Sequence, residues 1–169
     1  MAHESRVAIV PGSFDPVTVG HIDLIERAAR MFDRVIIAVL TNTSKQPFFS
    51  LEERVAMLCD VFKGRAGIDV DTFTGLLVDY ARAKQARVVV RGLRGLTEFD
   101  AETQMALMNR RLNPDVETVF VTSSETSGYV SSRLVREIAS LGGSVDGLVP
   151  PGVADRIAAR RRKSTLRQV

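Results

Sequence analysis

Residues 7–21 read VAIVPGSFDPVTVGH, and the rest of the chain can be interpreted outward from them. The first residues are small and apolar, as in a strand that is buried on both faces of a parallel sheet. The turn-forming residues Gly12, Ser13 and Asp15 follow, and we expect the Asp15 side chain to hydrogen-bond within its own loop. His21, one of two histidines in the chain, then stands at the threshold of a helical pattern. This order of strand, loop and helix predicts an anion site at the first turn of the helix.

Strand-like and helix-like patterns alternate along the rest of the chain. Short runs rich in Val and Ile predict strands at 6–10, 34–40, 68–73, 87–90 and 117–122. Amphipathic or capped segments predict helices at 21–32, 50–62, 75–85, 98–112 and 131–141, and a short helix after 150–152. Ser50 and Glu53 form a capping-box pattern at the start of the second helix. The alternation predicts an α/β fold: one doubly wound (Rossmann-like) domain with a mostly parallel five-stranded sheet, helices on both faces, and ligands beyond the carboxyl ends of the strands.

Composition suits one globular domain over residues 1–169, because 45% of the residues are hydrophobic and 25% are charged. No apolar run approaches the roughly 20 residues of a membrane span, and the first residues lack an apolar signal sequence. We therefore expect a cytoplasmic protein with no membrane partner. The single cysteine, Cys59, lies among apolar residues, and we expect a buried thiol.

The net charge is +3, and much of the excess lies in the basic segment 156–169. No aromatic residues interleave with these basic side chains to stack on bases. The segment therefore favours a solvated, fraying helical tail over a nucleic-acid contact, and we expect no nucleic-acid partner. Residues 1–5 and about 160–169 are expected to be flexible.

The loop after the first strand contains neither GxGxxG nor GxxxxGK[ST], so it is neither a dinucleotide fingerprint nor a Walker A loop. Gly12 and Gly20 allow a substrate to approach the backbone closely. The helix that begins near His21 offers free N–H groups to a phosphate, and the imidazole can donate a hydrogen bond to a phosphate oxygen on which charge builds. The residues alone leave His21 as either a catalytic group or a surface histidine of the helix.

Four motifs resemble those of the nucleotidylyltransferases, in the phosphopantetheine adenylyltransferase branch. GSFDPVTVGH (12–21) is similar to the GxFxPxxxGH signature, with Thr18 where the HxGH type has its first histidine. SKQPFFSLEERV (44–55) and VVVRGLRGLTEFDAETQMALMNRRL (88–112) are similar to stretches typical of that branch. VSSRLVR (130–136) resembles the ISSTxxR motif. The resemblance covers nearly the whole chain.

This resemblance implies transfer of AMP from ATP to 4′-phosphopantetheine, which gives dephospho-coenzyme A and pyrophosphate in the penultimate step of coenzyme A synthesis. It implies direct in-line attack by a phosphate oxygen, with catalysis by positioning and electrostatics. It further implies Mg²⁺ that is carried by ATP rather than by protein ligands. A homo-oligomer, usually a hexamer, and feedback inhibition by coenzyme A are implied as well.

The resemblance also implies site residues. His21, Lys45 and Arg94 would be catalytic, with His21 stabilising charge on the ATP phosphates in the transition state. The phosphopantetheine would be bound by Ser13, Lys45, Leu77 and Arg91, with Leu76 and Val78 supplying apolar surface. The implied ATP-binding residues are Ser13, Phe14, His21, Gly92, Leu93, Arg94, Glu102, Ser127, Gly128, Tyr129, Val130, Ser131, Ser132 and Arg133. From the residues alone, the two arginines also fit an ordinary turn, Glu102 a solvated helix position, and the serines simple helix caps.

Three positions depart from the family pattern and bear on nucleotide affinity. Ala101 stands where a tyrosine is usual, Ser127 where an aromatic residue is usual, and Arg133 where a serine is usual. Two other functions remain open: a related nucleotidylyltransferase acting on another phosphorylated acceptor such as nicotinamide mononucleotide, or a sensing or nucleic-acid-binding module that has lost catalysis. The intact His21 and both arginines argue against the second.

A stripe of apolar residues lies on the predicted helix 98–112. Met105, Met108 and Leu112 are spaced i, i+3 and i+7, so they share one helix face. We expect this face to belong to the core, with a partner surface as the alternative.

Overall fold

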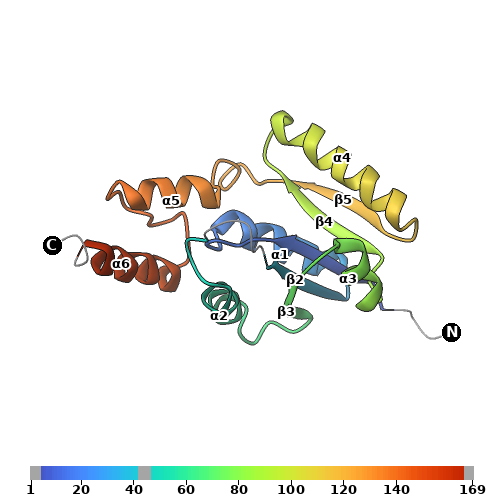
Figure 1. The fold of residues 1–169 in the computed structure, drawn as a ribbon, viewed down its shortest axis with the longest axis horizontal. Helices are drawn as coiled ribbons and strands as arrows, with labels where there is room; N and C mark the ends of the chain where they lie inside the picture. Colours follow the sequence, from blue (N-terminus) through green and yellow to red (C-terminus); the bar gives the residue numbers. More distant parts are fainter. Residues whose placement is uncertain (1–4, 42–46, 166–169) are drawn as a thin grey trace.

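The computed structural model describes residues 5–41 and 47–165, which form a five-stranded sheet and six helices (Figure 1). The strands are β1 (Val7–Gly12), β2 (Arg34–Leu40), β3 (Ile68–Phe73), β4 (Val88–Leu93) and β5 (Glu117–Thr122). The helices are α1 (Val19–Met31), α2 (Leu51–Val61), α3 (Leu77–Ala83), α4 (Leu96–Leu112), α5 (Ser132–Ser140) and α6 (Pro151–Thr165). The strand order is β3-β2-β1-β4-β5, and all neighbouring strands are parallel. The predicted fold class is confirmed.

Successive residues of β1 point into two cores, one on each face of the sheet. Ala8 and Val10 belong to the larger core, which also contains residues of α1, α2, α5 and α6. Ile9 belongs to the smaller core, together with Ala81 of α3. Helix α4 packs on β4, β5 and α3 (Figure 1). This alternation is why β1 begins with the apolar run VAIV and β2 carries the apolar run VIIAVL, with both faces of each strand covered.

The sheet opens at the point where the strand order reverses. β1 pairs with β2 from Val7 to Gly12, but it pairs with β4 only at Ala8 and Ile9. The carboxyl ends of β1 and β4 therefore diverge, and Figure 1 shows β4 and β5 turned away from β1. Ligands of open α/β sheets bind at such a point.

One expectation about the surface is wrong. Cys59 is exposed, because α2 buries the face that carries Arg54, Met57 and Leu58 and turns the next position toward solvent. The helix predicted after 150–152 is α6, which is longer than expected and runs over 15 residues to Thr165. The capping box of Ser50 and Glu53 is confirmed.

The apolar stripe of α4 is not part of the core of the single chain. Met105, Met108 and Leu112 are 57%, 55% and 47% exposed, so the expectation of a core face is wrong. The reason is that α4 lies over β4 and β5 at the edge of the sheet, and Asn109 is its one buried residue. The alternative, a partner surface, stays open.

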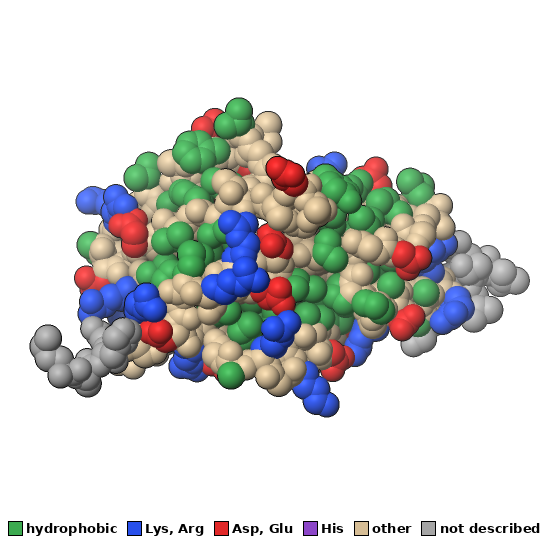
Figure 2. Space-filling model, turned by 180° about the vertical axis from the view of Figure 1, so that it is seen from behind, with side chains coloured by type: hydrophobic (Ala, Val, Ile, Leu, Met, Phe, Trp, Pro, Cys, Tyr) green, Lys and Arg blue, Asp and Glu red, His purple; other side chains and the backbone are tan. Residues whose placement is uncertain are grey.

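Charged side chains of both signs are interspersed on the face shown in Figure 2, where basic groups stand beside acidic ones. Surface ion pairs of the described residues include Arg34–Asp69 and Arg156–Asp60. In the part of the chain that the structure describes, no helix is long and apolar enough to cross a membrane.

Candidate active site

A pocket of about 520 Å³ lies at the diverging ends of β1 and β4. The loop between β1 and α1, the end of β4, helix α4 and the start of α5 form its walls. Eleven predicted site residues line it: Ser13, Phe14, His21, Arg91, Gly92, Arg94, Glu102, Val130, Ser131, Ser132 and Arg133. The structure thus brings together residues from three of the four motifs.

The histidine of the first motif is held by the residue that caps its helix. Thr18 caps α1, and its backbone N–H donates to Nδ1 of His21 over 3.1 Å. A neutral imidazole carries one N–H, so with Nδ1 accepting, the proton lies on Nε2. Burial, followed by the charges of Arg94 and Arg91, lowers the pKa of His21 to about 4. At neutral pH the pocket therefore contains an uncharged Nε2–H donor.

The loop that contains Ser13 is held in place by the buried side chain of Arg54. Arg54 of α2 is 4% exposed, and its Nη1 donates to the carbonyl oxygen of Ser13 over 2.8 Å and to that of Leu40 over 3.3 Å. Phe14 follows with a positive φ of 47°, and its buried ring packs edge-on against the His21 ring at 5.0 Å. The bonds from Arg54 and the backbone turn at Phe14 hold this loop between the carboxyl ends of β1 and β2.

Asp15 does not hydrogen-bond within its own loop, so that expectation is wrong. Its carboxylate accepts from the backbone N–H groups of Phe48 and Phe49, each over 2.7 Å. Its carbonyl oxygen accepts from Arg136 of α5. Asp15 therefore joins three segments around the pocket.

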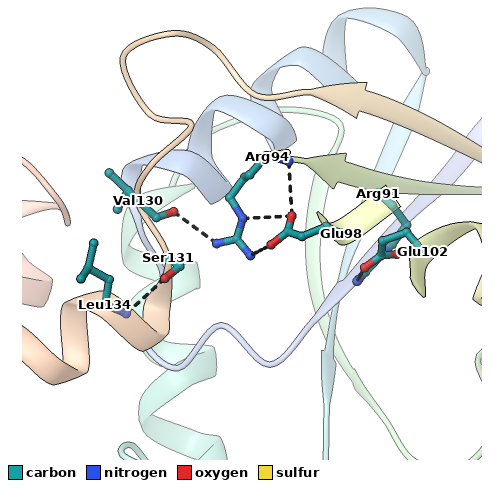
Figure 3. A network of polar contacts seen from close by, with 7 residues as sticks. All are labelled: Arg91, Arg94, Glu98, Glu102, Val130, Ser131 and Leu134. Carbon is teal, nitrogen blue, oxygen red and sulfur yellow. Dashed lines mark hydrogen bonds and ion pairs between the residues drawn. The ribbon is translucent and has the colours of Figure 1, made fainter. Parts of the chain in front are cut away.

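Both arginines of the third motif are paired with glutamates of α4 (Figure 3). Arg91 donates from Nε and Nη2 to Glu102 over 2.8 and 2.5 Å, and from Nη1 to the carbonyl oxygen of Pro11 over 2.9 Å. Arg94 donates from Nε and Nη2 to Glu98 over 3.3 and 2.6 Å, and from Nη1 to the carbonyl oxygen of Val130 over 3.4 Å. The bond to Pro11 bridges the gap where β1 and β4 diverge.

The serines at the start of α5 have structural partners in addition to their place in the pocket. Ser131 caps α5, because its side chain accepts from the N–H of Leu134 over 3.1 Å (Figure 3). The hydroxyl of Ser132 donates to the carbonyl oxygen of Pro16 over 2.8 Å. Capping and a place beside a phosphate are therefore compatible here.

The remaining predicted residues lie elsewhere. Ser127 is buried and shares a hydrogen bond with Ser124, while Tyr129 is 66% exposed. Outside the lining of this pocket are Leu93, Ser127, Gly128 and Tyr129. Lys45 falls outside the described residues.

A second pocket of about 640 Å³ shares Arg91 and Glu102 with the first. Its wall is largely apolar and includes the predicted Leu76 and Leu77 of the α3 segment, together with the α4 stripe Met105, Met108 and Leu112. Val78 is a buried residue of α3 and is outside this lining. The two pockets meet at the guanidinium of Arg91.

Three residues of the first pocket were missed as site residues from the sequence. Thr18 in TVGH stands three residues before its histidine, which is the spacing of a capping box. Glu98 is four residues before Glu102, so both lie on one helix face. Arg136 is the last residue of VSSRLVR and lines both pockets.

Among residues 5–41 and 47–165, no group of three or more His, Cys, Asp or Glu side chains is arranged to hold a metal ion. The carboxylates that do line the first pocket, Asp23, Glu98 and Glu102, each lie against an arginine. A dedicated Mg²⁺ cage therefore does not fit these residues.

Comparison with known proteins agrees with this geometry. Residues 9–138 match the cytidylyltransferase-like family model. A phosphopantetheine adenylyltransferase of Caldanaerobacter subterraneus subsp. tengcongensis is 51% identical over 159 residues, which are 94% of this chain and 99% of that protein. The chain belongs to the phosphopantetheine adenylyltransferase family. A member from Synechococcus sp. (strain JA-3-3Ab) is also 51% identical, over 91% of this chain and 97% of its own length.

Family membership makes this chain a nucleotidyltransferase. Among solved structures, a bifunctional NMN adenylyltransferase/ADP ribose pyrophosphatase from Francisella tularensis superposes with a TM-score of 0.71 at 14% identity. The match covers 92% of this chain and 49% of that protein. At this identity the likeness shows a shared fold. The alternative of a nicotinamide mononucleotide acceptor is therefore not favoured over the phosphopantetheine adenylyltransferase family.

Proposed function

We propose that this chain transfers AMP from ATP to 4′-phosphopantetheine and gives dephospho-coenzyme A and pyrophosphate, reversibly, as the penultimate step of coenzyme A synthesis. The observation that carries the proposal is the pocket at the diverging ends of β1 and β4. There a neutral imidazole and two arginines stand together, in a chain about 50% identical to named family members.

The chemistry needs little beyond positioning and charge stabilisation. A phosphate oxygen of the acceptor attacks the α-phosphorus of ATP in line, and the bond to pyrophosphate breaks. The Nε2–H of His21 would donate to a phosphate oxygen on which charge builds. Arg91 would bind the acceptor phosphate and Arg94 the nucleotide phosphates, since a guanidinium matches phosphate with two parallel donors. No covalent intermediate on the protein is required.

The second pocket supports the choice of acceptor. Because it is largely apolar and meets the first pocket at Arg91, it suits an acceptor with one phosphate and a long, weakly polar arm. We further propose that Mg²⁺ enters with ATP, that the chain acts in the cytoplasm as a homo-oligomer, usually a hexamer in this family, and that coenzyme A is a feedback ligand.

The test is pyrophosphate release from Mg-ATP with 4′-phosphopantetheine, nicotinamide mononucleotide or glycerol 3-phosphate as acceptor. We expect turnover with 4′-phosphopantetheine and a loss of about 100-fold in kcat for His21→Ala. His3→Ala, which removes the chain's other histidine, is the matched control and should keep full activity. Turnover confined to another acceptor would reject the proposed substrate. ATP binding without any turnover would favour the sensing module.

A further inference from the structure

The two arginine–glutamate pairs of the first pocket are built alike. Arg91 and Arg94 are three residues apart at the end of β4, and Glu98 and Glu102 are four apart on one face of α4. The chain reverses direction between them, so the later arginine meets the earlier glutamate (Figure 3). In both pairs the carboxylate takes Nε and Nη2, and a backbone carbonyl takes Nη1.

The carboxylate occupies the guanidinium edge that a phosphate would use. Carboxylate and phosphate bind the same fork of two parallel N–H groups. With Glu98 on Nε and Nη2 of Arg94, a phosphate reaches that edge only when the carboxylate leaves.

Glu98 is better placed to leave than Glu102. Its side chain is 35% exposed, against 19% for Glu102. It is also in the first turn of α4, where the helix N-terminus stabilises a carboxylate after it has lost its arginine. Rotation of Glu98 into solvent breaks its bonds to the guanidinium and, over 3.2 Å, to the backbone N–H of Arg94, and the exposure of the side chain and the helix N-terminus offset part of this cost.

We propose that Glu98 is an internal competitor for the phosphate site on Arg94. Its carboxylate holds the guanidinium in the ligand-free protein, and a phosphate of the nucleotide displaces it. An incoming anion must then bind Arg94 more strongly than the singly charged carboxylate of Glu98 does. This requirement favours multiply charged phosphates. The proposal rests on the proposed function in taking the anion to be the nucleotide's.

The experiment measures binding of inorganic pyrophosphate and of Mg-ATP to the full chain by isothermal titration calorimetry. Pyrophosphate is the simpler probe because it presents phosphate oxygens alone. Glu98→Gln keeps the shape of the side chain and removes its charge, and we expect about fivefold tighter pyrophosphate binding. Glu117→Gln is the matched control, because Glu117 is paired with Arg110 at the amino end of β5, away from the pocket. Asp100→Asn controls for net charge, since Asp100 is exposed on the same turn of α4. Both controls should stay within about twofold of wild type.

A double-mutant cycle with Arg94→Gln isolates the pair. In that background Glu98→Gln should no longer tighten binding. Unchanged or weaker pyrophosphate binding by Glu98→Gln overturns the inference, and so does a gain that persists without Arg94. The wild-type turnover assay reports separately on the proposed function. If the wild type turns over 4′-phosphopantetheine and Glu98→Gln binds pyrophosphate as tightly as the wild type, the inference about Glu98 is rejected and the proposed function stands.

Discussion

Replacing Asp15 by asparagine should destabilise the fold through two backbone donors, of which one is buried and one part-buried. The Asp15 side chain is 10% exposed, and its two oxygens accept from the N–H groups of Phe48 and Phe49, each over 2.7 Å. Asparagine has one acceptor oxygen and one NH₂ group. With its oxygen on one N–H, its NH₂ group faces the other, so one of the two donors is left unpaired.

The size of the effect follows from these contacts. Losing a hydrogen bond to a charged acceptor costs about 1.5–3 kcal/mol, and leaving a buried donor unsatisfied costs about 1–3 kcal/mol. Since the two costs overlap for one donor, we expect a loss of about 3 kcal/mol in the free energy of unfolding. For a domain of this size that corresponds to a fall in Tm of roughly 6–12 °C.

Urea denaturation followed by circular dichroism measures the change, with equal m-values for both proteins. Asp79→Asn is the matched control, because Asp79 is 63% exposed in its ion pair with Arg82, and it should change stability by less than about 0.5 kcal/mol. If Asp15→Asn were as stable as this control, the joining role of Asp15 would be refuted.

Three further predictions concern other side chains. In the ligand-free protein the His21 ring should titrate with a midpoint near 4, followed by NMR of its ring protons. The unfolded chain takes up that proton more readily, at a pKa of about 6.5, so stability should fall by up to roughly 3 kcal/mol as pH drops from 6.5 to 4. Cys59 should react fully with a thiol reagent in the folded protein, and protection would contradict its exposure. Met105→Gln with Met108→Gln should reduce the mass of the proposed homo-oligomer in sedimentation while changing the stability of the single chain by less than about 1 kcal/mol. A loss of 2–5 kcal/mol per residue would instead indicate a core position.

The sheet was predictable because its signal is local. Strands 34–40, 68–73 and 117–122 have the predicted bounds, since an apolar run in the first, apolar residues alternating with polar ones in the second and a short apolar run in the third stand between polar turns. The position of the pocket followed from topology, because parallel strands bring their carboxyl ends to one edge. The motifs after β1 and β4 therefore had to meet.

Partners that are distant in sequence were not predictable. Asp15 accepts from groups 33 and 34 residues away, and no local pattern encodes that choice. Arg91 and Glu102 were each predicted to contact a ligand, whereas in the structure they contact each other. An isolated charged residue indicates a site for charge, and only its tertiary neighbours determine which charge occupies it.

The burial of helix residues was predicted wrongly where few elements of the fold are available to cover the helix. The α4 stripe has the spacing of a core face, but α4 lies over β4 and the edge strand β5, so the prediction of a core position was wrong. Cys59 was misjudged for a related reason, since apolar neighbours in sequence lie about 100° away around a helix. Helical periodicity identifies a face, and the area available to cover it depends on the whole fold.

The charges that attract phosphate also set the state of the histidine. Burial is the largest cause of the lowered pKa of His21, and the charges of Arg94 and Arg91 lower it further. The ligand-free pocket therefore keeps a neutral Nε2–H donor. A bound polyphosphate would offset both positive charges and add negative charge beside the ring, and each effect favours the imidazolium form. The pKa of His21 should therefore rise when pyrophosphate binds, which an NMR titration of the ring protons with and without pyrophosphate would measure. An unchanged midpoint would mean that the arginine charges do not reach the ring. A raised midpoint would mean that binding itself prepares His21 to stabilise the charge that develops on the leaving phosphates.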